Sequence, residues 1–363
     1  MAQQKWRPIP RPKMALVLAA ALGLGALLSE GFRPRVAWAQ DEMFVTNALS
    51  PNSITVYART ANGNVAPLRT ISGGATELND PVGLAVDTVN NEVVVANFSG
   101  HSITVYGRTA GGNVAPLRTI SGAATGLNFP FGLAVDTVNN EVVVVNSRGN
   151  FSITVYSRTA SGDVPPLRTI SGGATGLNFP EGLGLDTVND ELLVANDSGN
   201  SVTVYSRTAS GNVAPLRTLV VLSGPRSVAV DTVNNELLVG HGSTVAAYGR
   251  TANGNVTPLR TISGAATGLN GADGLAVDTV NNEVVVVSGS IASVRVYSRT
   301  ANGNVAPLRT LSGAATELGG PFTPAITTEG APIPTLSEWA LVAMVALLFV
   351  SGLLALRRHP AAG

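Results

Sequence analysis

The sequence contains no cysteine among its 363 residues. Disulfide bridges, thiol catalysis and cysteine-ligated metals are therefore excluded. Charged residues are also scarce, at 13% of the chain, and the formal net charge is zero. Because nucleic-acid-binding domains normally carry a basic patch or a high pI, we expect no nucleic-acid partner.

Histidine is rare as well, with only His101, His241 and His359 in the whole chain. No Ser–His–Asp arrangement, metal-ligating cluster or glycine-rich phosphate loop stands out. We therefore expect no cofactor, no metal and no catalytic residue.

Glycine, proline and apolar residues are abundant instead. The chain has 40 glycines and 21 prolines, and 45% of its residues are hydrophobic. Turn-forming residues between segments rich in Val and Ile are typical of an all-β protein with many short strands.

The N-terminal segment has the three-part pattern of a secretory signal peptide. Four basic residues between positions 5 and 13 precede an apolar run over 14–28, and Ala37-Trp38-Ala39 supplies a small-residue cleavage site. This order predicts a signal peptide over residues 1–39 and an exported protein. An uncleaved N-terminal anchor is the alternative.

The C-terminal segment contains a second apolar run, residues 339–356, which has no charged residue and ends at Arg357-Arg358. As a helix rising 1.5 Å per residue it would be about 27 Å long, enough to cross the hydrocarbon core of a bilayer. We predict a transmembrane helix in the inner membrane, with the arginine pair as a stop at its cytoplasmic end.

A specific motif stands directly before this run: Ile333, Pro334, Thr335, Leu336, Ser337, Glu338 and Trp339. With the apolar run and the basic pair, it resembles the IPTL-CTERM sorting domain of Gram-negative bacteria. The resemblance implies that residues 333–363 are a sorting signal handled at the inner membrane by an exosortase-type sorting protease. Residues 328–334 are then a linker. A simple tail anchor is the alternative.

Between the two ends, one unit is repeated. A tyrosine in a V-Y-x-R-T-like segment recurs at Tyr57, Tyr106, Tyr156, Tyr205, Tyr248 and Tyr297, mostly 49 or 50 residues apart. Each unit divides into four expected strands, a to d, for example 83–87 (a), 92–97 (b), 102–106 (c) and 116–120 (d). A period of this length with several strands per unit indicates a β-propeller.

The ends of the repeat region predict how the ring closes. Residues 42–71 supply three strands without the first, and residues 321–326 supply a lone first strand, weakened by Pro324. We therefore predict a six-bladed propeller over residues 40–327, with its last blade built from three N-terminal strands and one C-terminal strand.

The repeated pattern P-x-G-L-A-V-D, N-N-E-V-V-V-A-N and S-I-T-V-Y resembles the NHL family of six-bladed propellers. The family includes protein- and RNA-binding scaffolds, a lyase and extracytoplasmic sensor domains. The resemblance therefore implies the fold and leaves the function open.

In such a blade, the b–c and d–a loops share one face of the disc, and here they differ between the copies. We propose these loop residues as binding candidates: Phe98, His101, Arg148, Asn150, Asp197, Asn200 and His241. Variation between copies is expected where a surface recognises an asymmetric partner, although unconstrained drift would also produce it.

One residue per blade is predicted to stand at the mouth of the central channel, where the first strand begins. These rim positions are Val82, Phe131, Glu181, Arg226, Asp273 and Phe322. Three consecutive blades are charged there and three are apolar, which predicts an amphipathic rim suited to a small or peptidic ligand. A Glu181–Arg226 surface pair with a solvated Asp273 is the alternative.

Two repeated charges invite other interpretations. The aspartate of the D-T-V-N-N-E turns could bind calcium, but such an aspartate ordinarily bonds to nearby backbone N–H groups, so we favour the turn. The arginine of the outermost strand is predicted to lie on a solvated edge.

Together these patterns predict an exported protein of the Gram-negative cell envelope, with its propeller in the periplasm or at the cell surface. We expect a non-enzymatic scaffold that binds an envelope protein or polymer. A metal-dependent, lactonase-like hydrolase or lyase using Glu181, Asp273 and His241 is the alternative, and a purely structural envelope component is a third hypothesis.

Overall fold

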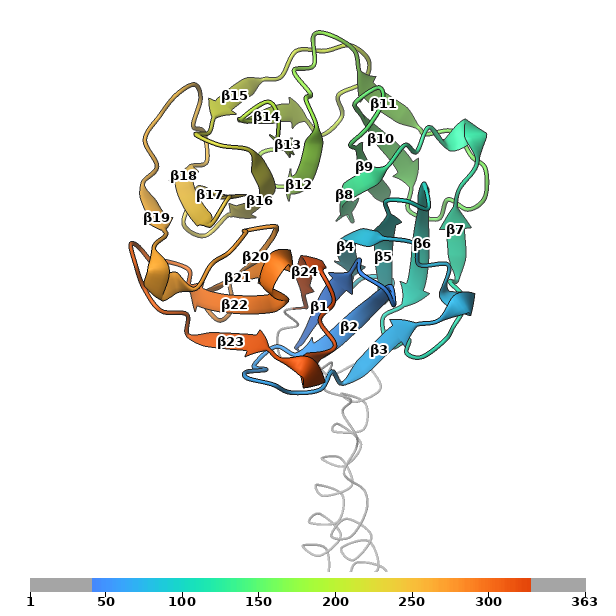
Figure 1. Cartoon of the computed structure of the whole chain (residues 1–363). Helices are drawn as coiled ribbons and strands as arrows, with labels where there is room; N and C mark the ends of the chain where they lie inside the picture. The colour runs from blue at the N-terminus through green and yellow to red at the C-terminus, as the bar shows by residue number, and fades with distance from the viewer. Residues whose placement is uncertain (1–40, 328–363) are drawn as a thin grey trace, which may run out of the picture. The chain divides into compact units, whose positions relative to one another are not determined.

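The computed structural model describes residues 41–327, and these form six four-stranded antiparallel sheets. The sheets are arranged as blades around a central axis (Figure 1). The predicted six-bladed all-β propeller is confirmed. The predicted signal peptide, linker, sorting signal and transmembrane helix lie outside the described residues. Within residues 41–327, no helix has the length and apolar character needed to span a bilayer.

Each blade runs from an innermost strand at the channel to an outermost strand at the outer edge of the disc. The innermost strands are β4 Pro81–Asp87, β8 Pro130–Asp136, β12 Pro180–Asp186, β16 Pro225–Asp231, β20 Gly274–Asp278 and β24 Pro321–Ile326. The second strands are β1 Glu42–Asn47, β5 Glu92–Asn97, β9 Glu141–Asn146, β13 Glu191–Asn196, β17 Glu236–His241 and β21 Glu283–Ser288.

The two outer positions of each blade follow the same order. The third strands are β2 Ser53–Ala58, β6 Ser102–Gly107, β10 Ser152–Ser157, β14 Ser201–Ser206, β18 Thr244–Gly249 and β22 Ser293–Ser298. The outermost strands are β3 Arg69–Ser72, β7 Arg118–Ile120, β11 Arg168–Ser171, β15 Arg217–Val220, β19 Arg260–Ile262 and β23 Arg309–Ser312. Short 3₁₀ turns are η1 Gly74–Thr76, η2 Ala123–Thr125, η3 Ala265–Thr267, η4 Gly289–Ile291 and η5 Ala314–Thr316.

The ring closes as predicted, because β24 pairs with β1 in the sheet ordered β24-β1-β2-β3. Pro324 lies opposite Val45 inside this ladder. It is accommodated because the innermost strand has a free edge toward the channel, and a proline is tolerated on an edge strand. Figure 1 shows β24, the last strand, beside β1, the first.

The apolar core is divided among the six junctions between neighbouring blades. One of its six clusters joins Val94 and Ile103 of one blade to Val142 and Tyr156 of the next. The inner strands are buried on both faces, which explains their nearly continuous Val and Leu sequences. Every blade therefore depends on both of its neighbours for its core.

The strand-d arginines are not solvated, and that prediction was wrong. Arg118 donates to both carboxylate oxygens of Glu92 in its own blade, at 2.6 and 2.7 Å. Its Nη2 also donates to the carbonyl of Arg158 in the next blade, at 2.6 Å. The outermost strand thus has a charged link within its blade and a hydrogen bond to its neighbour, and only 15% of the Arg118 side chain is exposed.

Candidate functional site

Three innermost strands, β4, β8 and β12, begin with P-x-G, and their glycines set how closely these blades approach their neighbours at the channel mouth. A Cβ atom on Gly83 would lie 1.9 Å from the carbonyl oxygen of Phe131 in the next blade, and one on Gly132 would lie 2.4 Å from that of Glu181. No side chain fits at these positions. In these blades the glycines therefore bring consecutive rim residues side by side, whereas β16 and β24 have Ser227 and Thr323 at the same position.

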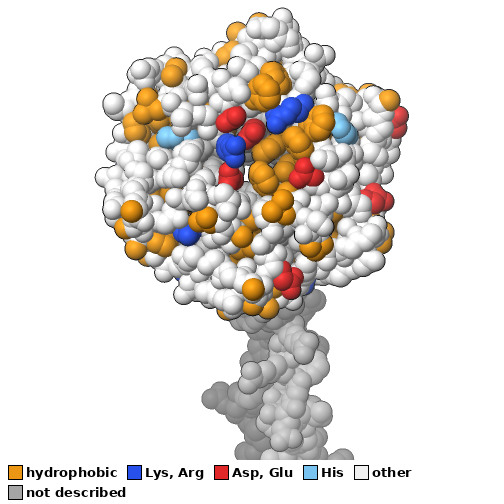
Figure 2. Space-filling view, viewed as in Figure 1, with side chains coloured by type: hydrophobic (Ala, Val, Ile, Leu, Met, Phe, Trp, Pro, Cys, Tyr) orange, Lys and Arg blue, Asp and Glu red, His pale blue; other side chains and the backbone are white. Residues whose placement is uncertain are grey.

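The structure brings the six rim residues together at one end of the channel. Each of the six lines at least one of three adjoining cavities at or beneath the mouth. Figure 2 shows the result on one face of the disc: a cluster of acidic and basic side chains beside a hydrophobic patch, around a central opening.

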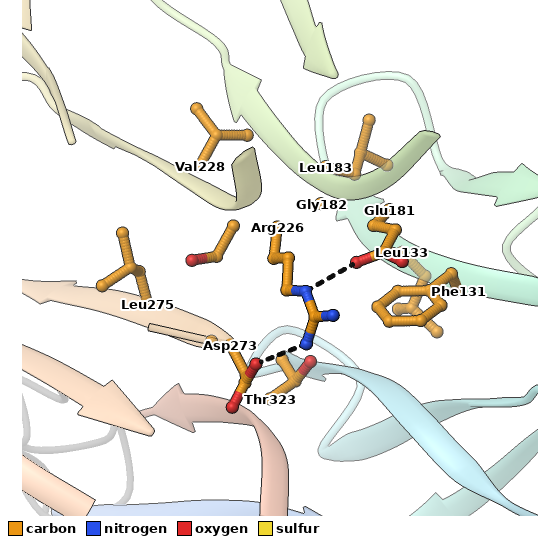
Figure 3. Close-up of a pocket in the computed structure, with 13 residues that line it drawn as sticks. Phe131, Leu133, Glu181, Gly182, Leu183, Arg226, Val228, Asp273, Leu275 and Thr323 are labelled. Carbon is orange, nitrogen blue, oxygen red and sulfur yellow. Dashed lines mark hydrogen bonds and ion pairs between the residues drawn. The ribbon is translucent and has the colours of Figure 1, made fainter. Parts of the chain in front are cut away.

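The ionic half of the rim is centred on Arg226, which projects from β16 between two carboxylates (Figure 3). Its Nη1 donates to Oδ1 of Asp273 at 2.9 Å, whereas its Nε lies 3.9 Å from Oε2 of Glu181, beyond hydrogen-bond distance. Asp273 is not solvated as the alternative required, because only 9% of its side chain is exposed. Its second oxygen accepts a hydrogen bond from the backbone N–H of Gly289 at 2.8 Å.

Glu181 has an unusual electrostatic environment. Burial raises the pKa of its carboxyl to about 7, against the lowering effect of Arg226. Because the ionised form loses its hydration there, the proton is retained to much higher pH than in water. The side chain can therefore gain or lose a proton near neutral pH.

The apolar half of the rim is a cluster of phenylalanine rings. Phe131 meets Phe98 edge-on at 5.8 Å between ring centroids and Phe322 at 5.9 Å. Phe98 also contacts Phe129 at 4.9 Å, and such tilted and T-shaped pairs are favourable aromatic geometries. These contacts join the rim to the neighbouring loops.

Arg148 extends this cluster toward the next blade. Its guanidinium carbon lies 4.9 Å from the ring centroid of Phe179 and 5.6 Å from that of Phe98. Its Nη1 donates to the carbonyl and the hydroxyl oxygens of Ser147, both at 3.1 Å. The loop arginine thus bridges two aromatic side chains beside the mouth.

A cavity of about 230 Å³ lies between the two halves, lined by both arginines, Glu181, Asp80, Val82 and three rings, those of Phe98, Phe131 and Phe322. A second cavity, of about 50 Å³, shares Phe131, Glu181 and Arg226 with it and is also lined by leucines of the inner strands. The cavity of about 230 Å³ therefore has room for a bound molecule larger than a few waters.

Of the predicted loop residues, the structure brings Phe98 and Arg148 to the rim cavity. His101 does not line the cavity, but its Nδ1 accepts the N–H of Phe129 at 3.2 Å. Asp197 does not line it either, but its charge helps to raise the pKa of Glu181. The remaining three loop residues, Asn150, Asn200 and His241, do not line this cavity. His241 instead lies 3.2 Å from the hydroxyl of Ser223.

Sequence reasoning missed Asp80, Phe129 and Phe179, and also Phe151, whose ring centroid lies 5.0 Å from that of Phe179. Asp80, Phe129 and Phe179 each precede the proline that begins an innermost strand, and all three have positive φ. This conformation is unfavourable for a side chain as bulky as phenylalanine. The signal was present in the sequence, because this position reads Asp, Phe and Phe in successive copies.

The repeated turn aspartates are structural, as favoured from the sequence. Oδ1 of Asp231 accepts the N–H groups of Val233 and Asn234 at 3.1 and 3.0 Å. The same oxygen accepts a hydrogen bond from Nη1 of Arg299 in the next blade at 3.1 Å. Within residues 41–327, no group of three or more His, Asp or Glu side chains is arranged to hold a metal ion.

Two family models match the chain. The NHL repeat model matches residues 78–106, and the IPTL-CTERM motif model matches residues 331–360. The chain carries an NHL repeat within a six-bladed propeller and an IPTL-CTERM motif near its C-terminal end. This motif implies processing by an exosortase-type sorting system, and the combination suggests an exported NHL propeller anchored in the envelope.

Solved structures support the fold alone. The nidogen/laminin complex matches with a TM-score of 0.59 and 15% identity over 80% of this chain and 99% of that chain. A protein of unknown function from Bacteroides caccae matches with a TM-score of 0.60 and 12% identity, over 80% and 100%. A functionally unknown protein from Desulfotomaculum acetoxidans matches with a TM-score of 0.56 and 13% identity, also over 80% and 100%. No curated protein matches this chain.

Proposed function

We propose that this exported propeller is a non-enzymatic binding scaffold of the cell envelope, and that the channel mouth is its binding surface. One observation supports the proposal most directly. Side chains that differ from blade to blade converge on one cavity, with rings on one side and an Arg–carboxylate cluster on the other. A concave site of apolar walls with a few convergent polar groups is typical of ligand recognition.

The carboxylate contacts also favour binding over catalysis. Both oxygens of Asp273 are engaged, one by Arg226 and one by the backbone of Gly289. A carboxylate held in this way positions the arginine and has little freedom to act as a base or a metal ligand.

The test is retention of components from an envelope extract by the immobilised full-length protein. We expect Phe131→Ala and Arg226→Gln to release a retained component, whereas Val138→Ser, in an a–b turn on the opposite face, retains it. Equal retention by all variants would contradict the assignment of the mouth as the binding surface.

A hydrolase or lyase is the second candidate, and the pKa of about 7 at Glu181 favours it. A carboxyl with a pKa near the working pH is suited to general acid–base catalysis. Chemical change of envelope peptides or glycans that disappears in the Glu181→Gln variant would establish this function and overturn the scaffold proposal.

A further inference from the structure

Arg226 presents unused hydrogen-bond donors to the mouth cavity. A guanidinium has five N–H donors, but within the described residues Arg226 makes one hydrogen bond, to Asp273. Its side chain remains 49% exposed, and Glu181, its other neighbour, stands 3.9 Å away. The unused donors of Arg226 therefore leave room at this point of the mouth for a hydrogen-bond acceptor.

The acidic residues offer less to a ligand. Asp273 uses both oxygens, and Oδ2 of Asp80 accepts a hydrogen bond from the hydroxyl of Ser99 at 2.9 Å. Glu181 becomes a neutral hydrogen-bond donor when its carboxyl is protonated. The mouth is therefore better prepared for an anionic group than for a cationic one.

The rest of the cavity is suited to an apolar body. The rings of Phe98, Phe131 and Phe322 and the side chain of Val82 line the same space of about 230 Å³ as Arg226. Because an apolar cavity of about 150 Å³ is enough for a benzene molecule, an aromatic or branched aliphatic group can enter. The guanidinium of Arg148 lies beside the ring of Phe98 and lines the same cavity.

We propose that the channel mouth binds a carboxylate attached to an apolar body. Arg226 pairs with the carboxylate through its unused donors, and the phenylalanine cluster holds the apolar group. The apolar C-terminal residue of a peptide and a free aromatic acid share this chemistry. The inference rests on the proposed function, since it names the ligand class of the same site.

Proton uptake by Glu181 supports the same ligand class. Arg226, Asp197, Arg148 and Asp273 are the charged groups that act on its carboxyl, and burial dominates over all of them. Below the pKa of about 7, a neutral Glu181 no longer repels an incoming carboxylate and no longer competes for Arg226. Carboxylate binding is therefore expected to be tighter at pH 6 than at pH 8.

The experiment is isothermal titration calorimetry on the detergent-solubilised full-length protein. The probes are hydrocinnamate and its amide, and acetyl-Gly-Gly-Phe with a free or an amidated C-terminus. We expect each acid to bind at least tenfold more tightly than its amide, because a charge-assisted hydrogen bond contributes about 1.5–3 kcal/mol. Tighter binding of the peptide acid identifies a peptide C-terminus, and tighter binding of hydrocinnamate identifies a free acid.

Three variants locate the interaction. Arg226→Gln should remove the preference for the acid, and Glu181→Gln should bind the acid at pH 8 about as tightly as the wild type does at pH 6. Arg295→Gln on β22, outside the lining of the cavity, is the matched control and should behave as wild type.

Equal affinity for acid and amide, or an unchanged preference in Arg226→Gln, would overturn the ligand class. The proposed function fails separately, if envelope components are retained equally by the wild type and by the mouth variants. Mouth-dependent retention without a preference for carboxylates would leave the scaffold standing and remove this inference alone.

Discussion

In β4, β8 and β12, glycine at the third position of P-x-G allows the innermost strand to approach the next blade closely. The φ of Gly83 lies outside the left-handed region, so its importance is steric: a methyl group there would overlap the carbonyl of Phe131 in the next blade. At Gly107, the last residue of β6, an added methyl group would meet no atom within 4 Å, so this glycine serves as a matched control.

We predict that Gly83→Ala lowers the free energy of unfolding by at least about 1–3 kcal/mol, the usual cost of overpacking, because a backbone carbonyl cannot rotate away. Gly107→Ala should change it by less than about 0.5 kcal/mol. Denaturant unfolding of both variants measures the difference. Equal stability of the two would show that the close approach of the blades is not sterically required.

Glu181 makes stability depend on pH. Its folded-state pKa of about 7 lies above the ordinary value of 4.5, so the folded protein binds more protons between these values. The favourable contribution is therefore complete below about pH 4.5 and is lost as the pH rises through about 7.

The Glu181→Gln variant removes this dependence, because glutamine does not ionise. We predict that it is more thermally stable than the wild type at pH 8 and that the advantage shrinks toward pH 5. Melting temperatures of both proteins across this range measure the effect. A difference that stays constant with pH would contradict the raised pKa.

At the scale of the strands, hydrophobic pattern and turn residues were enough to place each element. The second strand, residues 92–97, was predicted to the residue, whereas the outermost strand is Arg118–Ile120 instead of 116–120. The partners of Arg118, Glu92 and the carbonyl of Arg158, lie 26 and 40 residues away. Only the packed structure reveals that this arginine is paired and not solvated.

The candidate site, too, could be predicted from the sequence only in part. Blade topology alone placed Val82, Phe131 and Arg226 at one mouth, because every innermost strand begins there. The sequence showed only that the position of Phe129 and Phe179 differs between copies; that both reach the site depends on their left-handed backbone. Nor could it show that Asp273 is sheltered, because Gly289 donates to it from another loop.

The buried Asp–Arg pairs between blades give a test at this scale. The side chains of Asp231 and Arg299 are 0% and 6% exposed. We predict that Asp231→Asn destabilises the fold by about 3–5 kcal/mol, because Arg299 keeps its buried charge without this partner. The control is Asp163→Asn, since the c–d turns of other copies already have asparagine at this position.

Chemical denaturation of the two variants separates charge pairing from turn geometry, because asparagine retains the acceptor oxygen that the Asp231 turn needs. A second substitution, Arg299→Gln, should recover part of the loss. If Asp231→Asn were as stable as Asp163→Asn, the inter-blade pair would contribute nothing to stability.

At the scale of the whole molecule, the ring depends on its last strand. β24 covers the inner edge of β1 and adds Ala325 and Ile326 to the clusters on either side of that blade. A chain ending after residue 320 should therefore lose cooperative unfolding and aggregate through the exposed edge of β1. A chain ending after residue 328 keeps β24 and is expected to melt in a single transition. Calorimetry that finds the same melting temperature for both would contradict closure by β24.

The division of the disc into two faces is the basis of the functional account. The a–b and c–d turns repeat almost without change, whereas the mouth face combines phenylalanines from one half of the ring with the Arg226 cluster from the other. This asymmetry within a nearly symmetric fold is what the binding proposal explains.

The most direct test is site-specific photocross-linking in cells that export the protein. A photoreactive p-benzoylphenylalanine replaces Phe131 at the mouth or, in a second strain, Val138 in the a–b turn on the opposite face. The account predicts a discrete cross-linked envelope component from position 131, lost when Arg226→Gln is added, and none from position 138. Cross-links from position 138 alone, or none from position 131, would contradict the mouth as the binding surface.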